Sequence, residues 1–301
     1  MVIFVLIVAS GATILDAFIL FQFGLRQPHR SAGSGCISAD QLTSASVSTR
    51  YGSAVSNLWN LQSADGSIVL CYTSEKGMNS SVSFSNVKVQ GPPQNFVGYP
   101  EVGYGNNVEG DSFGPQSTLV SFPMTVLSLS QLNPWSNTTF VVKSLTAGSI
   151  DIGYDLWVKG SVGGPSVSTD YEVMILFQVP GPCTSYSAAT YQFTDTVYID
   201  SAPKLETWTA CVAAVGTHAR LVGFTLTGPS EIDAGSVALR PMDFIQSVEV
   251  KVNNISLPSY HVEGFEFGTE FWSSSVNQAV FQWSLSHWSI GSEGHMVSVV
   301  G

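Results

Sequence analysis

The chain has 301 residues, of which 44% are hydrophobic and only 11% are charged, and its formal net charge is −11. A chain of this length and hydrophobicity can bury one large core, so we expect a single main domain. The acidic balance, with only 11 Lys and Arg residues, leaves no basic patch to neutralise phosphates and argues against nucleic acid as a partner.

The first predicted element is an apolar segment, Val2 to Leu25. It is long enough to span a bilayer, and its small residues at 9–12 would admit signal-peptide cleavage, although no Lys or Arg precedes it. Arg26 and Arg30 follow it instead, which argues against simple export with an uncleaved anchor. We expect residues 1–35 to be a signal or membrane-anchor segment with a short linker, and the protein to be secreted or tethered to the cell membrane; an internal core helix is the alternative.

After residue 35 the sequence consists of short apolar runs and alternating patterns separated by Gly, Pro, Ser and Asn. This is typical of strands and turns, and predicts an all-β antiparallel sandwich of two sheets. The clearest predicted strands are 67–73, 80–89, 138–145, 149–158, 170–179 and 279–290.

One segment, residues 241–252, departs from this pattern. Met242, Phe244, Ile245 and Val248 recur at helical spacing after Pro241, a residue tolerated in the first turn of a helix. We predict a single helix here, packed on the sandwich.

The four cysteines are Cys36, Cys71, Cys183 and Cys211. They lack CxxC spacing and lie far from any His cluster, so we expect no metal site. Disulfides are expected if the chain is exported, and sequence order permits three pairings. We favour Cys36 with Cys71 and Cys183 with Cys211, because each pair closes a modest loop; four buried free thiols are the alternative. No nucleotide-binding or metalloprotease motif occurs, and we expect no cofactor.

Three predicted strands place carboxylates on one face, since residues i, i+2 and i+4 of a strand share a face. The groups are Glu172 with Met174 and Leu176, Glu266 with Gly268 and Glu270, and Asp151 with Gly153, Asp155 and Trp157. Paired carboxylates of this kind hydrolyse glycosidic bonds, one as the acid and the other as nucleophile or base. Many lectins also have acidic and aromatic residues in a cleft, so the pattern alone fits either class.

Five motifs resemble those of glycoside hydrolase family 12, the small jelly-roll endo-β-1,4-glucanases. "YEVMI" is similar to that family's nucleophile strand, "FEFGTEFW" to its acid/base strand and "GYDLW" to a strand with a third acidic residue. "SNLWN" and "VGYPEVGYG" resemble its Asn-Leu-Trp and Gly-Tyr-Pro-Glu elements. The matches run in family order from about residue 36 to the C-terminus.

The resemblance implies that residues 36–301 form a jelly-roll catalytic domain with a concave substrate cleft. Glu172 would be the nucleophile and Glu270 the general acid/base of a retaining reaction, with Asp155 hydrogen-bonded to the nucleophile. Glu270 must then be protonated at rest and Glu172 ionised. Trp59 would stack on sugar rings and Met174 would line the cleft floor; the other candidate substrate-binding residues are Tyr99, Glu266 and Trp272.

Three residues depart from the family's pattern: Leu176 replaces a usual Trp, Phe271 a Pro and Asn60 a Gly. We expect a monomeric endo-β-1,4-glucanase acting on cellulose-type or mixed-linkage β-glucans. A xyloglucan-preferring endoglucanase is the alternative, because Leu176 leaves room for a branched polymer. A non-catalytic carbohydrate-binding surface protein is the alternative from another class, but it has no need of two converging carboxyl groups.

Overall fold

The structure is a computed structural model that describes residues 34–39, 45–90, 96–179, 189–213, 219–226, 231–252, 256–292 and 294–301. The predicted N-terminal signal or anchor segment lies outside these residues. Among the helices of the described part, none is long and apolar enough to cross a membrane.

Strands dominate the described residues, and most of them belong to one long ribbon of hydrogen-bonded neighbours. Its first half runs in the order β1 (Gly35–Ala39), β4 (Leu61–Thr73), β5 (Gly77–Val89), β19 (Ala279–Ser292), β9 (Trp135–Ala147), β16 (Ala234–Leu239) and β13 (Ala189–Ile199). Its second half continues with β14 (Ala202–Val212), β15 (Arg220–Leu226), β12 (Tyr171–Gln178), β11 (Ile152–Lys159), β17 (His261–Gly268), β7 (Glu101–Gly105), β3 (Ser53–Val55) and β2 (Ser46–Ser48).

Shorter strands complete the sheets of the described residues. β20 (His295–Val300) pairs with β19, and β8 (Met124–Thr125) pairs with β17. A separate small sheet consists of β10 (Ser149–Ile150), β18 (Phe271–Trp272) and β6 (Phe96–Gly98). This sheet brings the segment after β17 next to the segment before β11.

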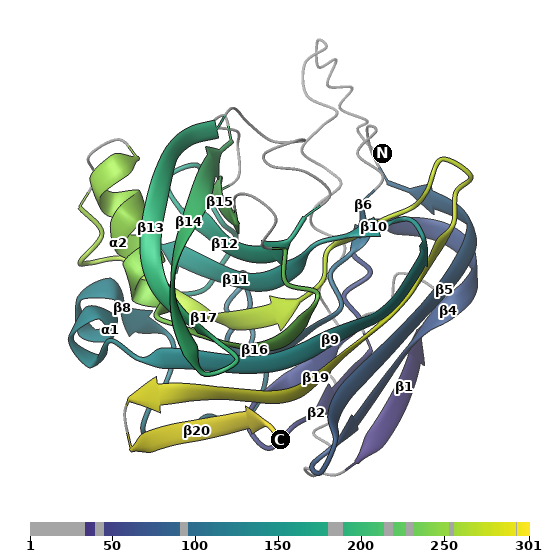
Figure 1. Ribbon diagram of the computed structural model, residues 1–301, viewed down its shortest axis with the longest axis horizontal. Coiled ribbons are helices and arrows are strands. Elements are labelled where there is room, and N and C mark those ends of the chain that lie inside the picture. The colour runs from purple at the N-terminus through teal and green to yellow at the C-terminus, as the bar shows by residue number, and fades with distance from the viewer. Residues whose placement is uncertain are drawn as a thin grey trace, which may run out of the picture.

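The ribbon curls so that its two halves face each other across the core (Figure 1). Phe140 of β9 lies 5.6 Å from Phe177 of β12 and 5.4 Å from Phe267 of β17, measured between ring centroids. Trp283 and Trp288 of β19 also contact Phe267. These rings are fully buried and join the two halves, as the apolar faces of the predicted strands require. The predicted two-layer β-sandwich is confirmed.

One pair of neighbouring strands runs parallel, whereas the sequence predicted antiparallel pairs throughout. β12 and β15 run parallel, with Glu172 opposite Leu221 and Met174 opposite Gly223. β13 and β14 lie between β12 and β15 in the chain. The chain reverses direction from β13 to β14 and again from β14 to β15, and β15 then runs beside β12 in the same direction. Alternation of apolar residues is the same in both kinds of pair, so the sequence pattern does not reveal the difference.

The predicted helix is α2, Pro241–Lys251, with Pro241 in its first turn and Met242, Phe244, Ile245 and Val248 buried. The prediction of only one helix was wrong, since the described residues include a second, α1 (Val126–Leu132). Thr125 caps it by accepting a hydrogen bond from the Ser128 amide at 3.1 Å. With two buried residues, α1 is too short to show a helical period in the sequence.

Cys36 and Cys71 form the first predicted disulfide and lie directly opposite each other on β1 and β4. The bridge links β1, the edge strand of the first half of the ribbon, to its neighbour β4. Cys183 lies outside the described residues, so its bridge to Cys211 stays a prediction.

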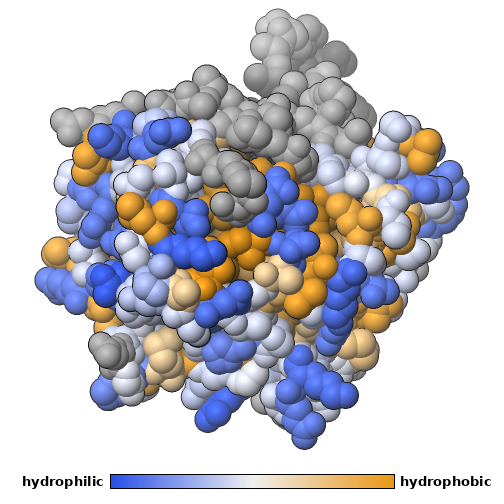
Figure 2. All heavy atoms as spheres, viewed as in Figure 1, coloured by the Kyte–Doolittle hydropathy of each residue, from blue (hydrophilic) through white to orange (hydrophobic). Residues whose placement is uncertain are grey.

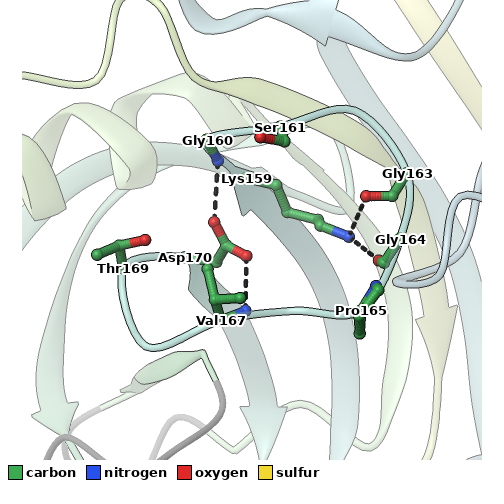
Figure 3. Close-up of a pocket in the computed structure, with 9 residues that line it drawn as sticks. All are labelled: Lys159, Gly160, Ser161, Gly163, Gly164, Pro165, Val167, Thr169 and Asp170. Atoms are coloured by element: carbon green, nitrogen blue, oxygen red, sulfur yellow. Dashed lines mark hydrogen bonds between the residues drawn. The ribbon is translucent and has the colours of Figure 1, made fainter.

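A pocket of about 350 Å³ lies where the chain turns from β11 to β12 (Figure 3). Lys159, only 1% exposed, donates hydrogen bonds to the carbonyls of Val108, Gly163 and Gly164. Asp170 accepts from the amides of Gly160 and Val167, at 2.9 and 2.8 Å. Because backbone groups satisfy both side chains, we interpret them as anchors of this loop, which leads directly into the strand of Glu172.

The surface matches the composition. In the space-filling view of Figure 2 much of the visible face is pale, the tone of residues with intermediate hydropathy, as expected for a chain with 11% charged residues.

Candidate active site

The three strands predicted to bear carboxylates are neighbours in the second half of the ribbon. β11 lies between β12 and β17, with Asp155 directly opposite both Met174 and Glu266 and with Trp157 opposite Glu172. The residues that alternate with them on the other face belong to the hydrophobic core: Val173, Ile175 and Phe177 of β12, Tyr154 and Leu156 of β11, and Phe265 and Phe267 of β17. The strand-parity argument is therefore confirmed for these residues.

Glu270 reaches the site by a different route from the predicted one. β17 ends at Gly268 and β18 begins at Phe271, so Glu270 is not part of a continuous strand with Glu266. Asp151 holds it instead: the Glu270 amide donates to Asp151 Oδ1 at 2.9 Å, and the Asp151 amide donates to the Glu270 carbonyl at 3.0 Å. The pairing of β10 with β18 brings the two segments together.

Two further carboxyl groups belong to the site and received no role from the sequence. Asp151 stands on the predicted polar face, but its contact with Glu270 spans 119 residues of chain. Glu101 lies on β7 opposite Gly268, and its Oε1 accepts a hydrogen bond from Asn57 Nδ2 at 3.0 Å. The only sequence signal for Glu101 was its place in "VGYPEVGYG".

Solvent reaches only two of these six carboxylate residues to an appreciable degree. Glu172 and Glu270 are partly exposed, whereas Glu101, Asp151, Asp155 and Glu266 are between 3% and 5% exposed. A substrate approaching this face can therefore touch the carboxyl groups of Glu172 and Glu270 most directly.

The six groups form three hydrogen-bonded pairs: Asp155 with Glu172, Asp151 with Glu270, and Glu101 with Glu266. Two carboxyl groups can share a hydrogen bond only if one of them is protonated. Each pair in the site therefore holds at least one proton.

No group of three or more His, Cys, Asp or Glu side chains in the described ranges is arranged to hold a metal ion.

In the first pair, the proton belongs to Asp155. Burial, together with the charges of Glu172 and Glu266, raises the pKa of Asp155 well above its usual range. Burial also raises the pKa of Glu172, to about 7, but the hydrogen bond from Asp155 opposes this rise. Glu172 is therefore the member of the pair that ionises first.

In the second pair, the proton belongs to Glu270. Burial is the main cause of its raised pKa, and the charges of Asp151 and Glu172 raise it further, well above the usual value. Asp151 has a pKa of about 8, raised by burial and lowered by its hydrogen bonds with Glu270. A protonated Glu270 near an ionised Glu172 is the separation of roles that acid-assisted displacement requires.

Aromatic side chains cluster around Trp272, which follows Glu270 by two residues. Trp59 is 41% exposed and its ring centroid lies 6.5 Å from that of Phe96, which in turn lies 4.3 Å from that of Trp272. Tyr99 and Met174 are only 5% and 3% exposed, and the Tyr99 hydroxyl donates to the Gly153 carbonyl at 3.3 Å. Of the predicted substrate-binding residues, Trp59 offers the most ring surface, and Tyr99 and Met174 lie beneath the face.

We predict that the fold is less stable at pH 8 than at pH 5. The pKa values of Glu101 and Asp151 are raised to about 8, so the folded state binds more protons than the unfolded state between about pH 4 and 8. The free energy of unfolding therefore falls across this window, by about 1.4 kcal/mol per pH unit for each extra proton bound. Calorimetry should show a lower Tm at pH 8, and Glu101→Gln should reduce the difference. A Tm that is constant or rises from pH 5 to 8 would contradict this account.

Comparison with known proteins gives a consistent result at the level of structure. No protein-family model and no curated protein matches the sequence. A family 12 xyloglucanase from Bacillus licheniformis is similar in structure, with a TM-score of 0.56, 18% identity and coverage of 88% of this chain and 100% of the other.

Two endoglucanases are similar as well. A metagenome-derived family 12 endoglucanase has a TM-score of 0.59 and 16% identity, covering 89% of this chain and 100% of the other. Endoglucanase Cel12A from Rhodothermus marinus has a TM-score of 0.56 and 16% identity, covering 88% of this chain and 99% of the other. The chain therefore has the jelly-roll fold of the family 12 glycoside hydrolases, as its motifs predicted.

Proposed function

We propose that this protein is a retaining endo-β-1,4-glucanase. The observation that carries the proposal is the pair Glu172 and Glu270: they are the two carboxylate residues of the site that reach solvent, and each is bonded to a buried carboxyl partner that favours opposite protonation states. A carbohydrate-binding protein gains nothing from such an arrangement, whereas glycoside hydrolysis needs one acid and one ionised carboxylate.

The reaction would proceed by double displacement. Glu270 donates its proton to the departing glycosidic oxygen while the carboxylate of Glu172 attacks the anomeric carbon and forms a glycosyl-enzyme. Glu270, now ionised, takes a proton from water while the water oxygen attacks the anomeric carbon and breaks its bond to Glu172. The sugar is released, Glu172 is again a carboxylate and Glu270 is again protonated. Retention requires the two carboxyl groups to lie about 5 to 5.5 Å apart, and we expect this separation.

Asp155 would act through Glu172. Its hydrogen bond fixes the orientation of the nucleophile and keeps Glu172 more acidic than burial alone would allow. When Glu172 becomes part of the glycosyl ester, Asp155 keeps its proton, because its pKa is raised by burial as well as by charge.

The substrate proposed is a β-1,4-linked glucan of the cellulose or mixed-linkage type. The test is release of reducing ends from carboxymethylcellulose, barley β-glucan and xyloglucan by the purified full chain, with Glu172→Ala as the control for contaminating activity. Clear preference for xyloglucan would favour the second candidate, which the similarity to a xyloglucanase structure and Leu176 in place of a Trp support. Binding of all three polymers without cleavage would contradict the proposal.

We predict that Trp59→Ala weakens substrate binding and leaves the fold intact. The indole is 41% exposed, so its removal leaves no large cavity, while a sugar ring loses its stacking surface. KM for barley β-glucan should rise about tenfold, roughly 1.4 kcal/mol, and Tm should change little. Trp208→Ala, which removes a fully buried indole, is the matched control and should destabilise the fold by about 3 to 5 kcal/mol. Unfolding of the Trp59 variant would place Trp59 in the core.

The protein would act as a monomer outside the cell, with Val2 to Leu25 as signal peptide or membrane anchor. Sequencing the N-terminus of the exported protein distinguishes the two. A chain that keeps residue 1 and stays in the cytoplasm would contradict export.

A further inference from the structure

Phe113 is an aromatic residue beside the site that neither the core nor the proposed reaction uses. Its side chain is partly exposed. Among the described residues, it belongs neither to the buried hydrophobic core nor to the partly buried residues packed against that core. Exposed apolar residues are common on protein surfaces, so the placement of this ring decides what it can do.

The ring of Phe113 lies flat on Gly103 of β7. If residue 103 had a Cβ, the ring carbons Cε1, Cε2 and Cζ would all be at the same distance from it, well inside van der Waals contact. A point equally far from three ring carbons lies over the face of the ring and not beside its edge. Residue 103 must therefore be a glycine for the ring to approach the strand this closely.

Gly103 places this ring on the polar face of the sheet. It stands directly opposite Glu266 on β17, and it alternates along β7 with the core residues Val102 and Tyr104. β7 is separated from β12 by β17 and β11, which makes three strand spacings of about 4.8 Å, or roughly 14 Å. The ring thus flanks the site without reaching the sugar that Glu172 would attack.

Backbone hydrogen bonds fix Phe113 in this position. Its amide donates to the Gly105 carbonyl at 2.9 Å, and its carbonyl accepts from the hydroxyl of Ser53 on β3. Glu109 belongs to the same loop and lies close to the site: burial is the main cause of the raised pKa of Glu266, and the charge of Glu109 adds to it. A ring held in this way is preorganised, so a ligand that packs on it orders few groups.

Phe113 and Trp59 lie on the same side of the nucleophile strand. Ser53, which holds Phe113, is the first residue of β3, and β3 leads within a few residues to Asn57 and Trp59. Asn57 in turn donates to Glu101 of β7. The two partly exposed rings therefore flank the same pair of strands, β3 and β7.

We propose that Phe113 is a stacking platform for a glucosyl ring of the substrate that lies away from the cleaved bond, on the side of Trp59. This inference rests on the proposed function and deepens it, because the substrate must be long enough to extend from Glu172 to β7. The apolar face of the sugar packs on the exposed face of the phenyl ring. Binding energy from this remote contact then helps to hold the reacting part of a long glucan in place.

Substitutions at Phe113 separate stacking from the filling of space. Phe113→Leu keeps an apolar side chain but has no flat face, whereas Phe113→Tyr keeps the ring. On barley β-glucan, kcat/KM should fall about fivefold to tenfold in Phe113→Leu and less than about twofold in Phe113→Tyr. On an aryl cellobioside, which is too short to reach β7, Phe113→Leu should lose much less. Leu119→Ala changes an exposed residue of the same segment, and this control should leave both values unchanged.

Gly103→Ala tests the same contact from the strand. The added methyl group would collide with the ring of Phe113 and displace it, so this variant should lose about as much kcat/KM on barley β-glucan as Phe113→Leu. In Gly103→Ala/Phe113→Ala the methyl group has room, and the double variant should lose no more than Phe113→Ala alone. Additive losses from the two substitutions would contradict a shared role for the glycine and the ring.

A binding measurement does not depend on turnover. In the Glu172→Ala background, calorimetry should show that Phe113→Leu raises the Kd for cellohexaose about fivefold to tenfold and changes the Kd for cellobiose much less. If the wild type cleaves no glucan but this difference appears, the proposed function fails and the stacking platform stands. Unchanged cellohexaose binding by a folded Phe113→Leu protein would overturn the inference, as would equal losses on barley β-glucan and the aryl cellobioside. Absence of any cellohexaose binding would overturn both proposals.

Discussion

Glu172→Ala is expected to lower kcat on natural β-glucan by a factor on the order of 10⁴ or more, because no group remains to attack the anomeric carbon. Glu172 is partly exposed, so the fold should survive the change and Tm should stay close to the wild-type value. The loss would be measured as initial rates of reducing-end release at the pH optimum of the wild type.

Added azide or formate should restore cleavage of an aryl cellobioside with a good leaving group by the Glu172→Ala variant. The anion takes the space of the missing carboxylate, and the product should have inverted configuration. Glu172→Gln is the matched control: its amide fills the same space, so azide should not restore activity. Restored activity in both variants would show that the anion acts elsewhere.

Wild-type stereochemistry gives an independent check on the same residue. NMR of the first product released should show a β-configured reducing end. An α-configured end would show inversion and would remove Glu172 from the role of nucleophile.

The polar face of the site could be predicted from the sequence because its signal is local. Along each strand, Glu172 and Asp155 alternate with apolar residues such as Ile175 and Tyr154, which lie on the other face and must be buried. Burial of that apolar face turns the carboxylates to the opposite face. The same reasoning found α2, whose apolar residues repeat over about two turns after a proline.

The carboxyl partners could not be predicted because they depend on which strands become neighbours. Asp151 meets Glu270 across 119 residues of chain, and Glu101 meets Glu266 only because β7 pairs with β17. Alternation gives the face of a residue but not its neighbour on the next strand. The parallel contact of β12 with β15 was missed for the same reason.

Glu270→Ala should separate the two steps of the proposed reaction. Hydrolysis of natural glucan should fall by a factor on the order of 10³ or more, since the leaving oxygen then departs without a proton. A dinitrophenyl cellobioside needs no protonation, so it should still react with Glu172, and the glycosyl-enzyme should accumulate because no base activates water. The expected observation is a rapid burst of dinitrophenol followed by slow turnover, with the added mass of the sugar on the peptide that contains Glu172.

The pH dependence of this variant identifies the acid. Glu270 has its pKa raised well above the usual value by burial and by the charges of Asp151 and Glu172, so it should set the alkaline limb of the wild-type profile, where the acid loses its proton. In Glu270→Ala this limb should disappear for the dinitrophenyl substrate, while the acid limb set by Glu172, with its pKa of about 7, should remain. An alkaline limb that persists unchanged would assign the proton donor to another residue, and Asp151, hydrogen-bonded to Glu270, would be the first to examine through Asp151→Asn.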